Sequence, residues 1–257
     1  MSRLHLTFEC GSSQLAATLD SAPGSTGLLL VSGGNEIRSG AFGGQAALAA
    51  DIAEAGFPVF RFDRRGVGDS EGENRGFRKS GKDIAAALAA FRAIAPQVTR
   101  VVGLGNCDAA SALMLAAGAG CDTLVLSNPW TYDEEAEHRM PPADIRSRYS
   151  EKLRNPSELA RLLTGGVDLR KLVAGMCQAL RAPAPRSTLA EEMRAGLADF
   201  GGPARFLVAG GDRTGMAFES AWGEDPRLSR CDHATHAYVE AESRKWLQEE
   251  LLSVLRG

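Results

Sequence analysis

The chain of 257 residues is long enough to bury one large core, and its 44% hydrophobic and 24% charged residues are ordinary for a globular protein. Its formal net charge of -3 leaves no basic surplus to neutralise a phosphate backbone, so we expect no nucleic-acid partner. The 5 cysteines show no metal-ligand spacing, the N-terminus lacks a hydrophobic signal core, and no apolar run approaches the roughly 20 residues that cross a bilayer. We therefore expect a cytoplasmic protein without a membrane span, a metal ion or a cofactor.

Strands and helices are expected to alternate along most of the chain. Short apolar runs bounded by glycine or polar residues predict strands at residues 4–10, 14–19, 27–31, 57–62, 100–104, 124–126 and 205–209. Longer segments with helical periodicity predict helices at residues 46–55, 82–94, 108–118 and 240–255. Such alternation predicts the α/β fold class, with a mostly parallel central sheet and helices on both faces.

The alternation stops between residues 131 and 200. This stretch is charged, contains several prolines and shows only helical periodicity. We interpret residues 131–200 as an inserted helical cap, and residues 1–130 and 201–257 as the α/β core. Because the insertion separates two core strands, the cap should lie over the carboxyl ends of the strands, where open α/β sheets bind ligands.

A thiol stands at one of the expected turns between a strand and a helix. The segment Gly105-Asn106-Cys107-Asp108-Ala109 matches the nucleophile-elbow pattern Gly-x-Ser-x-Gly, with cysteine for serine and alanine for the second glycine. The small residues two positions before and after Cys107 leave room for a strained turn. The helix N-terminus also favours thiolate over thiol. We therefore predict that Cys107 is a nucleophile.

A nucleophilic thiol needs a base that takes its proton. Of the 4 histidines, His5 and His138 fall in the first expected strand and in the cap. His233 and His236 follow the last expected strand and precede the final helix, which is where this architecture places a catalytic imidazole. Both remain candidates. Position favours His236, because a small residue, an aromatic residue and the acidic start of the helix come after it.

The carboxylate that orients the base should follow the preceding strand. Asp212 lies in the glycine-rich turn after the last expected strand. The chain order that accompanies a nucleophile elbow is nucleophile, acid and histidine, and Cys107, Asp212 and His236 obey it. Asp199 and Asp225 are weaker alternatives because neither of them ends an apolar run.

Backbone N–H groups are the expected donors to an oxyanion. The N–H of Asp108 belongs to the first turn of a helix and has no helical partner there. The loop at residues 32–35 offers a second donor, and we choose Gly34 because a missing side chain lets a substrate approach closely. We also name Arg38 and Trp130 as candidate substrate-binding residues, since Arg38 could pair with an anionic substrate group or with a cap carboxylate.

A second motif, Asp63-x-Arg65-Gly66-x-Gly68-x-Ser70, ends an expected strand. Its glycines invite comparison with a phosphate-binding loop, but no Gly-Lys-Ser/Thr follows them and the segment does not open into a helix. Together with the Gly-x-Cys-x-Ala elbow, this motif resembles the α/β-hydrolase superfamily. The resemblance implies the α/β-hydrolase fold.

A narrower resemblance covers nearly the whole chain. The sequence is similar to the exosortase A system-associated hydrolase 1 family, whose members carry cysteine where most relatives carry serine. They occur near genes for exopolysaccharide synthesis and PEP-CTERM protein sorting. The similar segments are Gly33-Gly34-Asn-Glu-Ile-Arg38-Ser-Gly, Arg-Phe-Asp-x-Arg-Gly-x-Gly-Asp-Ser-Glu-Gly at residues 61–72, Cys107-Asp108-Ala-Ala-Ser111 and Asn128-Pro129-Trp130.

In that family an Ala-Asp-His-Thr-Phe-like segment holds the histidine. Its best match is Ala-Thr-His-Ala-Tyr at residues 234–238, so the resemblance favours His236 over His233. The chain departs from the family at Asn35, where proline is expected, and at Thr235, where an acid is expected.

A Cys-His-Asp triad attacks a carbonyl and forms an acyl-thioenzyme through a tetrahedral oxyanion. Our first interpretation is hydrolysis of an ester or thioester in a small-molecule acyl substrate, within an exopolysaccharide or exosortase system. Acyl transfer to a sugar or lipid carrier is an alternative, as is a non-catalytic binding protein on a hydrolase scaffold. A partly apolar acyl pocket would be lined by Trp130, Tyr132, Met140 and Tyr149.

Overall fold

The computed structural model describes residues 2–132 and 188–257. They contain one eight-stranded sheet in the order β1-β2-β4-β3-β5-β6-β7-β8. The pairs β1-β2 and β2-β4 are antiparallel, and the other five neighbouring pairs are parallel. The strands are β1 (Arg3–Cys10), β2 (Ser13–Asp20), β3 (Thr26–Val31), β4 (Val59–Phe62), β5 (Arg100–Asn106), β6 (Thr123–Ser127), β7 (Ala204–Ala209) and β8 (Leu228–Cys231).

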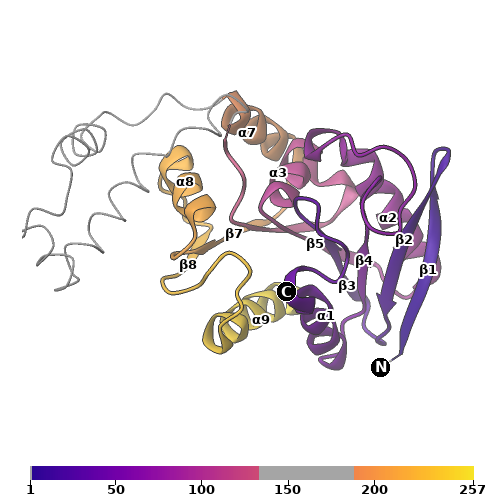
Figure 1. Ribbon diagram of the computed structural model, residues 1–257. Helices are drawn as coiled ribbons and strands as arrows, with labels where there is room; N and C mark the ends of the chain where they lie inside the picture. The colour runs from indigo at the N-terminus through magenta and orange to yellow at the C-terminus, as the bar shows by residue number, and fades with distance from the viewer. Residues whose placement is uncertain (1, 133–187) are drawn as a thin grey trace, which may run out of the picture.

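Helices cover both faces of the sheet (Figure 1). Helices α1 and α9 pack on one face, and α2, α3, α7 and α8 pack on the other. Within residues 2–132 and 188–257, no helix has the length and apolar character that crossing a membrane requires. The helices are α1 (Gly44–Glu54), α2 (Gly81–Ile94), α3 (Asp108–Leu115), α7 (Thr188–Phe200), α8 (Arg213–Trp222) and α9 (Ala241–Arg256), with short 3-10 helices η1 (Ala41–Gly43), η2 (Phe77–Lys79) and η3 (Ala117–Gly120).

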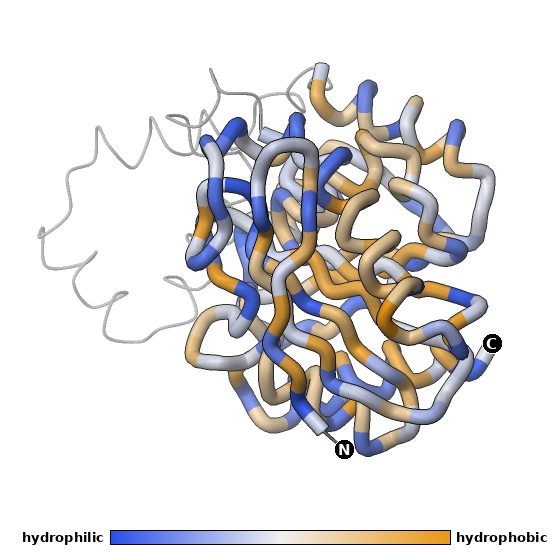
Figure 2. The backbone as a smooth tube through the Cα atoms, turned by 90° about the vertical axis from the view of Figure 1, so that its right-hand side faces the viewer, coloured by the Kyte–Doolittle hydropathy of each residue, from blue (hydrophilic) through white to orange (hydrophobic). Residues whose placement is uncertain are grey.

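The central strand β3 shows why the sheet has a core on each face. Leu28 and Leu30 point to the core under α1 and α9, whereas Leu29 and Val31 point to the opposite core. All four side chains are at most 2% exposed, and they alternate because successive strand residues face opposite sides. In Figure 2 the hydrophobic segments gather in the middle of the molecule. The prediction of a buried central strand here is confirmed.

The observed fold confirms the predicted α/β class and its mostly parallel sheet. Sequence patterns missed β8 because this edge strand has only 4 residues, none of which is fully buried. The helix expected at residues 108–118 ends at Leu115. A 3-10 turn follows it, where Gly118 has a φ of 73°. Ala117, just before it, already has a φ of 46°, so the chain leaves the right-handed helical conformation directly after Ala116.

Helix α7 lies within residues 131–200, which we expected to form the cap, and it packs against α3. The two helices approach closely, since a Cβ at Gly196 would lie 2.2 Å from the carbonyl oxygen of Met114. Residues 133–187, where most of the predicted cap falls, lie outside the described residues. The division into core and cap stays a prediction.

The parallel strands bring several loops to one edge of the sheet. Gly34 follows β3, Cys107 follows β5, Asp212 follows β7 and His236 follows β8. Ligand sites of parallel sheets form at this edge, because the carboxyl ends of the strands and the helix N-termini meet there. Residues that are far apart in the sequence thus gather around Cys107.

Candidate active site

Cys107 joins β5 to α3 in a conformation that residues other than glycine rarely adopt, with φ 61° and ψ -128°. Strained backbone at such a strand-to-helix turn is typical of a nucleophile elbow. A Cβ at Gly105 would lie 2.6 Å from the carbonyl carbon of Ala109, and a Cβ at Gly33 would lie 2.6 Å from the carbonyl oxygen of Asn106. The turn can close around Cys107 because both of these positions are glycine.

Backbone hydrogen bonds hold Cys107 in this conformation. Its N–H donates to the carbonyl of Ser127 at 3.0 Å, at the end of the neighbouring strand β6. Its own carbonyl accepts from the N–H of Ala110 at 3.1 Å and from the N–H of Trp130 at 3.3 Å. Strained residues persist where surrounding contacts fix them in this way. Cys107 as a residue is only partly buried.

The predicted acid and the favoured histidine lie together. Nδ1 of His236 lies 2.8 Å from Oδ2 of Asp212, whose residue is 8% exposed. The same carboxylate caps α8 by accepting from the N–H of Gly215 at 3.0 Å, which fixes its position. Hydrogen bonds with the side chains of Asp212 and, second, of Cys107 raise the pKa of His236 to about 10. The structure thus places Cys107, Asp212 and His236 next to one another.

Two asparagines that the sequence patterns did not indicate hold the His236 loop against the elbow. Asn106 Nδ2 donates to the carbonyl of His236 at 3.1 Å. Asn128 Nδ2 donates to Oδ1 of Asn106 at 3.0 Å, and Asn128 Oδ1 accepts from the N–H of Ala209 at 2.8 Å. These amides tie β5, β6 and β7 to the histidine loop. Only their positions at strand ends could have suggested such a role.

The alternative candidates lie elsewhere. His233 is exposed, and Asp199 is exposed on α7. Asp225 accepts hydrogen bonds from the guanidinium of Arg227 and, at 3.0 Å, from the indole of Trp222. The Arg227 guanidinium is the main reason that the pKa of this carboxyl falls well below its usual range. Asp225 therefore serves a local ion pair.

The remaining cysteines lie in different surroundings from Cys107. Cys10 and Cys121 are buried, and burial raises the pKa of the Cys121 thiol to about 12. Cys231 is partly buried in β8, and Cys177 lies outside the described residues. Across residues 2–132 and 188–257, no group of three or more His, Cys, Asp and Glu side chains could hold a metal ion.

The two predicted oxyanion donors differ in their surroundings. The N–H of Asp108 has no acceptor within the described part of the chain. The N–H of Gly34 donates to Oδ1 of Asp108 at 2.5 Å. In this arrangement the carboxylate of the residue after the nucleophile thus accepts from Gly34, and the role of the Gly34 N–H as an oxyanion donor stays a prediction.

Arg64, which sequence reasoning missed, holds the Asp108 carboxylate. Its Nη2 donates to Oδ2 of Asp108 at 3.3 Å and to the carbonyl of Gly34, and its Nη1 donates to Oγ of Ser80 at 3.4 Å. Arg64 is only 5% exposed, and a buried guanidinium needs such partners. Arg64 and Asp108 are 44 positions apart, so no local pattern predicts their contact.

Arg38 is bound within the protein. Its Nη1 donates to Asp63 and, at 3.0 Å, to Asp69, while its Nε donates to Oγ1 of Thr18 at 3.2 Å. These contacts hold the guanidinium against Asp63, and a substrate role of Arg38 stays a prediction. The motif that begins at Asp63 fixes the loops after β3 and β4 to each other.

Trp130 lies beside the elbow, since its N–H binds the carbonyl of Cys107 and its carbonyl accepts from Oγ of Ser111 at 2.8 Å. Its partly buried ring meets the ring of Tyr132 edge to face, with centroids 4.6 Å apart. Met140 and Tyr149, which we expected in the same acyl pocket, lie outside the described residues. A substrate role of Trp130 stays a prediction.

The mostly parallel sheet and the strained elbow after β5 define the α/β-hydrolase fold. The family described as "Alpha/beta hydrolase family" matches residues 28–249, and the chain belongs to this family. A comparison with curated proteins gives no match.

Solved structures share this fold over nearly their whole length. The esterase Pf2001 of Pyrococcus furiosus has a TM-score of 0.64 and 11% identity, covering 99% of this chain and 90% of its own. The alpha/beta hydrolase GrgF from Penicillium sp. sh18 has a TM-score of 0.65 and 15% identity. This match covers 100% of the present chain and 98% of GrgF. Est1E from Butyrivibrio proteoclasticus, bound to ferulic acid, has a TM-score of 0.59 and 14% identity. This match covers 98% of the present chain and 100% of Est1E. At these identities the likeness shows the fold.

Proposed function

We propose that this protein hydrolyses an ester or thioester bond of a small-molecule acyl substrate. In this proposal Cys107 is the nucleophile, His236 is the acid and base, and Asp212 orients the imidazole. The observation that carries it is the thiol at a strained elbow, beside an imidazole that is hydrogen-bonded to a buried carboxylate. Membership of the Alpha/beta hydrolase family supports the reaction class, and the name of the esterase Pf2001 supports an acyl ester as substrate.

The first step forms a thioester on the enzyme. The pKa of His236 is raised to about 10, so its imidazole is a strong enough base to take the proton of Cys107 as the sulfur attacks. The sulfur forms a bond to the carbonyl carbon, and the carbonyl π electrons move to the oxygen. The N–H of Asp108 donates to this oxyanion. When the oxyanion collapses, the alcohol or thiol leaves with the proton of His236.

The second step frees the sulfur of Cys107, which leaves with the proton that His236 takes from water. His236, now neutral, takes a proton from a water molecule whose oxygen attacks the thioester carbon. The second tetrahedral oxyanion collapses, the bond between carbon and sulfur breaks, and the carboxylic acid departs. Asp212 is hydrogen-bonded to Nδ1 of the imidazole, so Nε2 is the nitrogen that exchanges protons with the sulfur and the water.

The cellular setting follows from the narrower resemblance. The segments that are similar to exosortase A system-associated hydrolases support a role in exopolysaccharide or PEP-CTERM systems, in the cytoplasm. We retain residues 131–200 as a helical cap over the strand ends, where it would cover the acyl group beside Trp130. A cap in this place would keep bulk water from the thioester and limit the size of the substrate.

The proposal is tested with Cys107→Ala on short p-nitrophenyl esters and on acyl thioesters. We expect the variant to lose roughly 1,000-fold or more in kcat, because removing the nucleophile of a triad leaves only the oxyanion donors and binding. Mass spectrometry should find one iodoacetamide adduct on Cys107 in the wild-type protein. Equal rates of wild type and Cys107→Ala would overturn the proposal.

Cys231→Ala is the matched control. This cysteine is also partly buried, but it lies in β8 rather than at the elbow. The control should hydrolyse the same substrates at the wild-type rate and should keep the iodoacetamide adduct on Cys107. Such a result separates the role of the elbow thiol from a general sensitivity to cysteine loss.

A further inference from the structure

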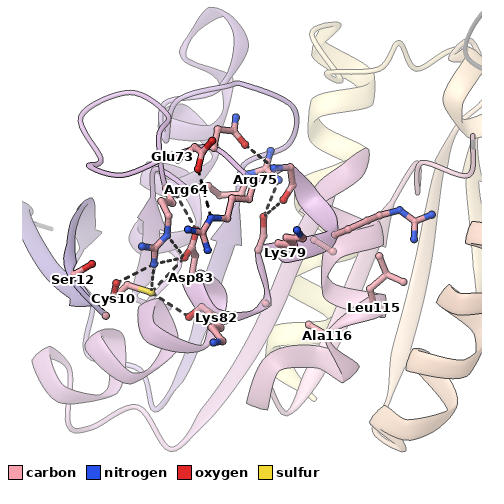
Figure 3. A pocket seen from close by; sticks show the side chains of 18 residues that line it. Cys10, Ser12, Arg64, Glu73, Arg75, Lys79, Lys82, Asp83, Leu115 and Ala116 are labelled. Carbon is pink, nitrogen blue, oxygen red and sulfur yellow. Dashed lines mark hydrogen bonds and ion pairs between the residues drawn. The ribbon is translucent and has the colours of Figure 1, made fainter. Parts of the chain in front are cut away.

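A cavity of about 640 Å³ lies beside the N-terminus of α2 and the flank of α3, and the proposed reaction does not use it (Figure 3). This volume is typical of a small-molecule site. Basic side chains dominate the charged residues among the described ones that line it, and two of these described residues are acidic, Glu73 and Asp83. The basic residues are Arg64, Arg65, Arg75, Arg78, Lys79 and Lys82.

Two of these positive charges lack a counter-ion within the described part of the chain. Each of the four arginines pairs with one carboxylate, namely Arg64 with Asp108, Arg65 with Asp83, Arg75 with Glu73 and Arg78 with Glu192. Lys79 and Lys82 form no ion pair with any described residue, and both are exposed. Their two charges match the charge of one phosphate monoester, which is about -1.5 to -2 at pH 7.

The backbone adds to the positive potential. Helix α2 has 14 residues and begins at Gly81, in the short segment between the two lysines, and among the described residues no side chain caps its N-terminus. The partial positive charge of a helix N-terminus favours an anion, and here it adds to a basic cavity. Asp83 lies in the first turn, but Arg65 neutralises its carboxylate at 3.1 Å.

The cavity adjoins the elbow. Arg64 lines the cavity and also binds Asp108 and the carbonyl of Gly34, both beside Cys107. Ala112, on the wall of the cavity, lies four residues beyond Asp108 on α3, which is about 6 Å along the helix axis. A ligand in the cavity can therefore belong to the same molecule as an acyl group at Cys107.

We propose that this cavity binds a phosphate group of the acyl donor, so that the substrate is an acyl thioester or ester on a phosphate-bearing carrier. This inference rests on the proposed hydrolase function and names its substrate class. Lys79 and Lys82 supply the charge that the phosphate neutralises, and Arg64 lies between the phosphate and the acyl group. The same lysines would select against a neutral carrier.

The test compares two donors with the same thioester and pantetheine arm: acetyl-coenzyme A, which carries phosphates and an adenosine, and S-acetylpantetheine, which carries neither. The lysine variants then isolate the contribution of the phosphates. We expect the wild-type protein to show a ratio of kcat/KM values that favours acetyl-coenzyme A roughly tenfold or more, because charged hydrogen bonds to phosphate are strong. The double variant Lys79→Glu/Lys82→Glu should lower this ratio by a similar factor, because KM for acetyl-coenzyme A should rise. Both lysines are exposed, so the variant should fold.

The matched control is Lys245→Glu on α9, an exposed lysine outside the cavity, which should leave the ratio unchanged. Equal kcat/KM values for the two donors, or a ratio that the double variant does not alter, would overturn the inference. Hydrolysis of p-nitrophenyl esters that depends on Cys107 would then still stand, so this failure differs from failure of the proposed function.

Inorganic pyrophosphate, titrated by calorimetry, separates a substrate phosphate from a free one. We expect it to bind the wild-type protein more tightly than the double variant and to compete with acetyl-coenzyme A. If pyrophosphate binds at the lysines but changes only kcat, without competition, the cavity holds a separate effector and the assignment to the acyl donor is wrong.

Discussion

The imidazole of His236 links protonation to stability at the level of one residue. Its pKa in the folded protein is about 10, above the ordinary value of 6.5, so the folded state binds the proton more tightly. The resulting stabilisation is complete below pH 6.5 and is lost as the pH rises toward 10. Because the side chain is 39% exposed, solvent screens the pair with Asp212, and we expect an effect of about 1 kcal/mol.

His236→Gln checks this linkage, since glutamine can reach Asp212 but does not titrate. Urea denaturation should show the wild-type protein losing more unfolding free energy than the variant between pH 6.5 and pH 10. A difference between the two proteins that stays constant over this range would contradict the assigned pKa. NMR of the imidazole carbons gives the pKa directly.

Asp108 limits the oxyanion site in the present arrangement. Its carboxylate accepts a hydrogen bond from the N–H of Gly34 at 2.5 Å and would lie next to the negative charge that develops on the substrate oxygen. Loss of one oxyanion donor costs on the order of 100-fold in rate, so release of a second donor should raise kcat by tenfold or more. We expect this gain in Asp108→Ala, measured with p-nitrophenyl acetate.

Asp108→Asn serves as the comparison because its amide oxygen can still accept from Gly34. We expect a smaller gain in kcat than for Asp108→Ala. Both variants leave Arg64 without its carboxylate, and an uncompensated buried charge should lower the thermal midpoint. If Asp108→Ala is slower than wild type while it remains folded, the carboxylate assists the reaction instead of blocking an oxyanion donor.

At the level of elements, the contact between α7 and α3 depends on one small residue. A Cβ at Gly196 would meet the backbone carbonyl of Met114, which cannot move as a side chain can. Gly196→Ala should therefore displace α7 and destabilise the protein by about 1–3 kcal/mol, as overpacked contacts do. Chemical denaturation measures the loss.

Gly44→Ala, in α1, is the matched control for the same substitution. A Cβ there meets nothing within 4 Å, so alanine should stabilise the helix by up to about 1 kcal/mol. Opposite signs for the two variants are the expected outcome. Equal small effects would show that α7 does not pack tightly on α3.

The elements also show what sequence patterns could and could not predict. The apolar run of β3 and the elbow of Cys107 are local signals, because burial and a strained turn each restrict the residues within a short segment. The order of Asp212 and His236 in the chain followed from the fold that those signals imply. The contacts of Arg64 and of Asn128 join distant segments through side chains, and no periodicity records such contacts. Sequence patterns missed the short edge strand β8 because it contains no run of buried residues.

At the level of the whole molecule, one sheet supports two separate hydrophobic cores. Trp222 on α8 belongs to one core, and Trp246 on α9 packs against the other. Strand β3 contributes to both cores with alternate side chains, and its backbone pairs with β4 and β5. A loss of packing on one face should therefore disrupt strands that the other face needs.

We predict that both faces unfold together. In proteins that keep a single tryptophan, either Trp222 or Trp246, the fluorescence transitions in urea should have the same midpoint. Leu29→Ala removes a fully buried side chain from only the core of Trp222, and it should destabilise the protein by about 2–5 kcal/mol. The midpoints of both probes should then shift equally. A transition of Trp246 that stays at its original midpoint in Leu29→Ala would show instead that the core under α1 and α9 folds independently of the other face.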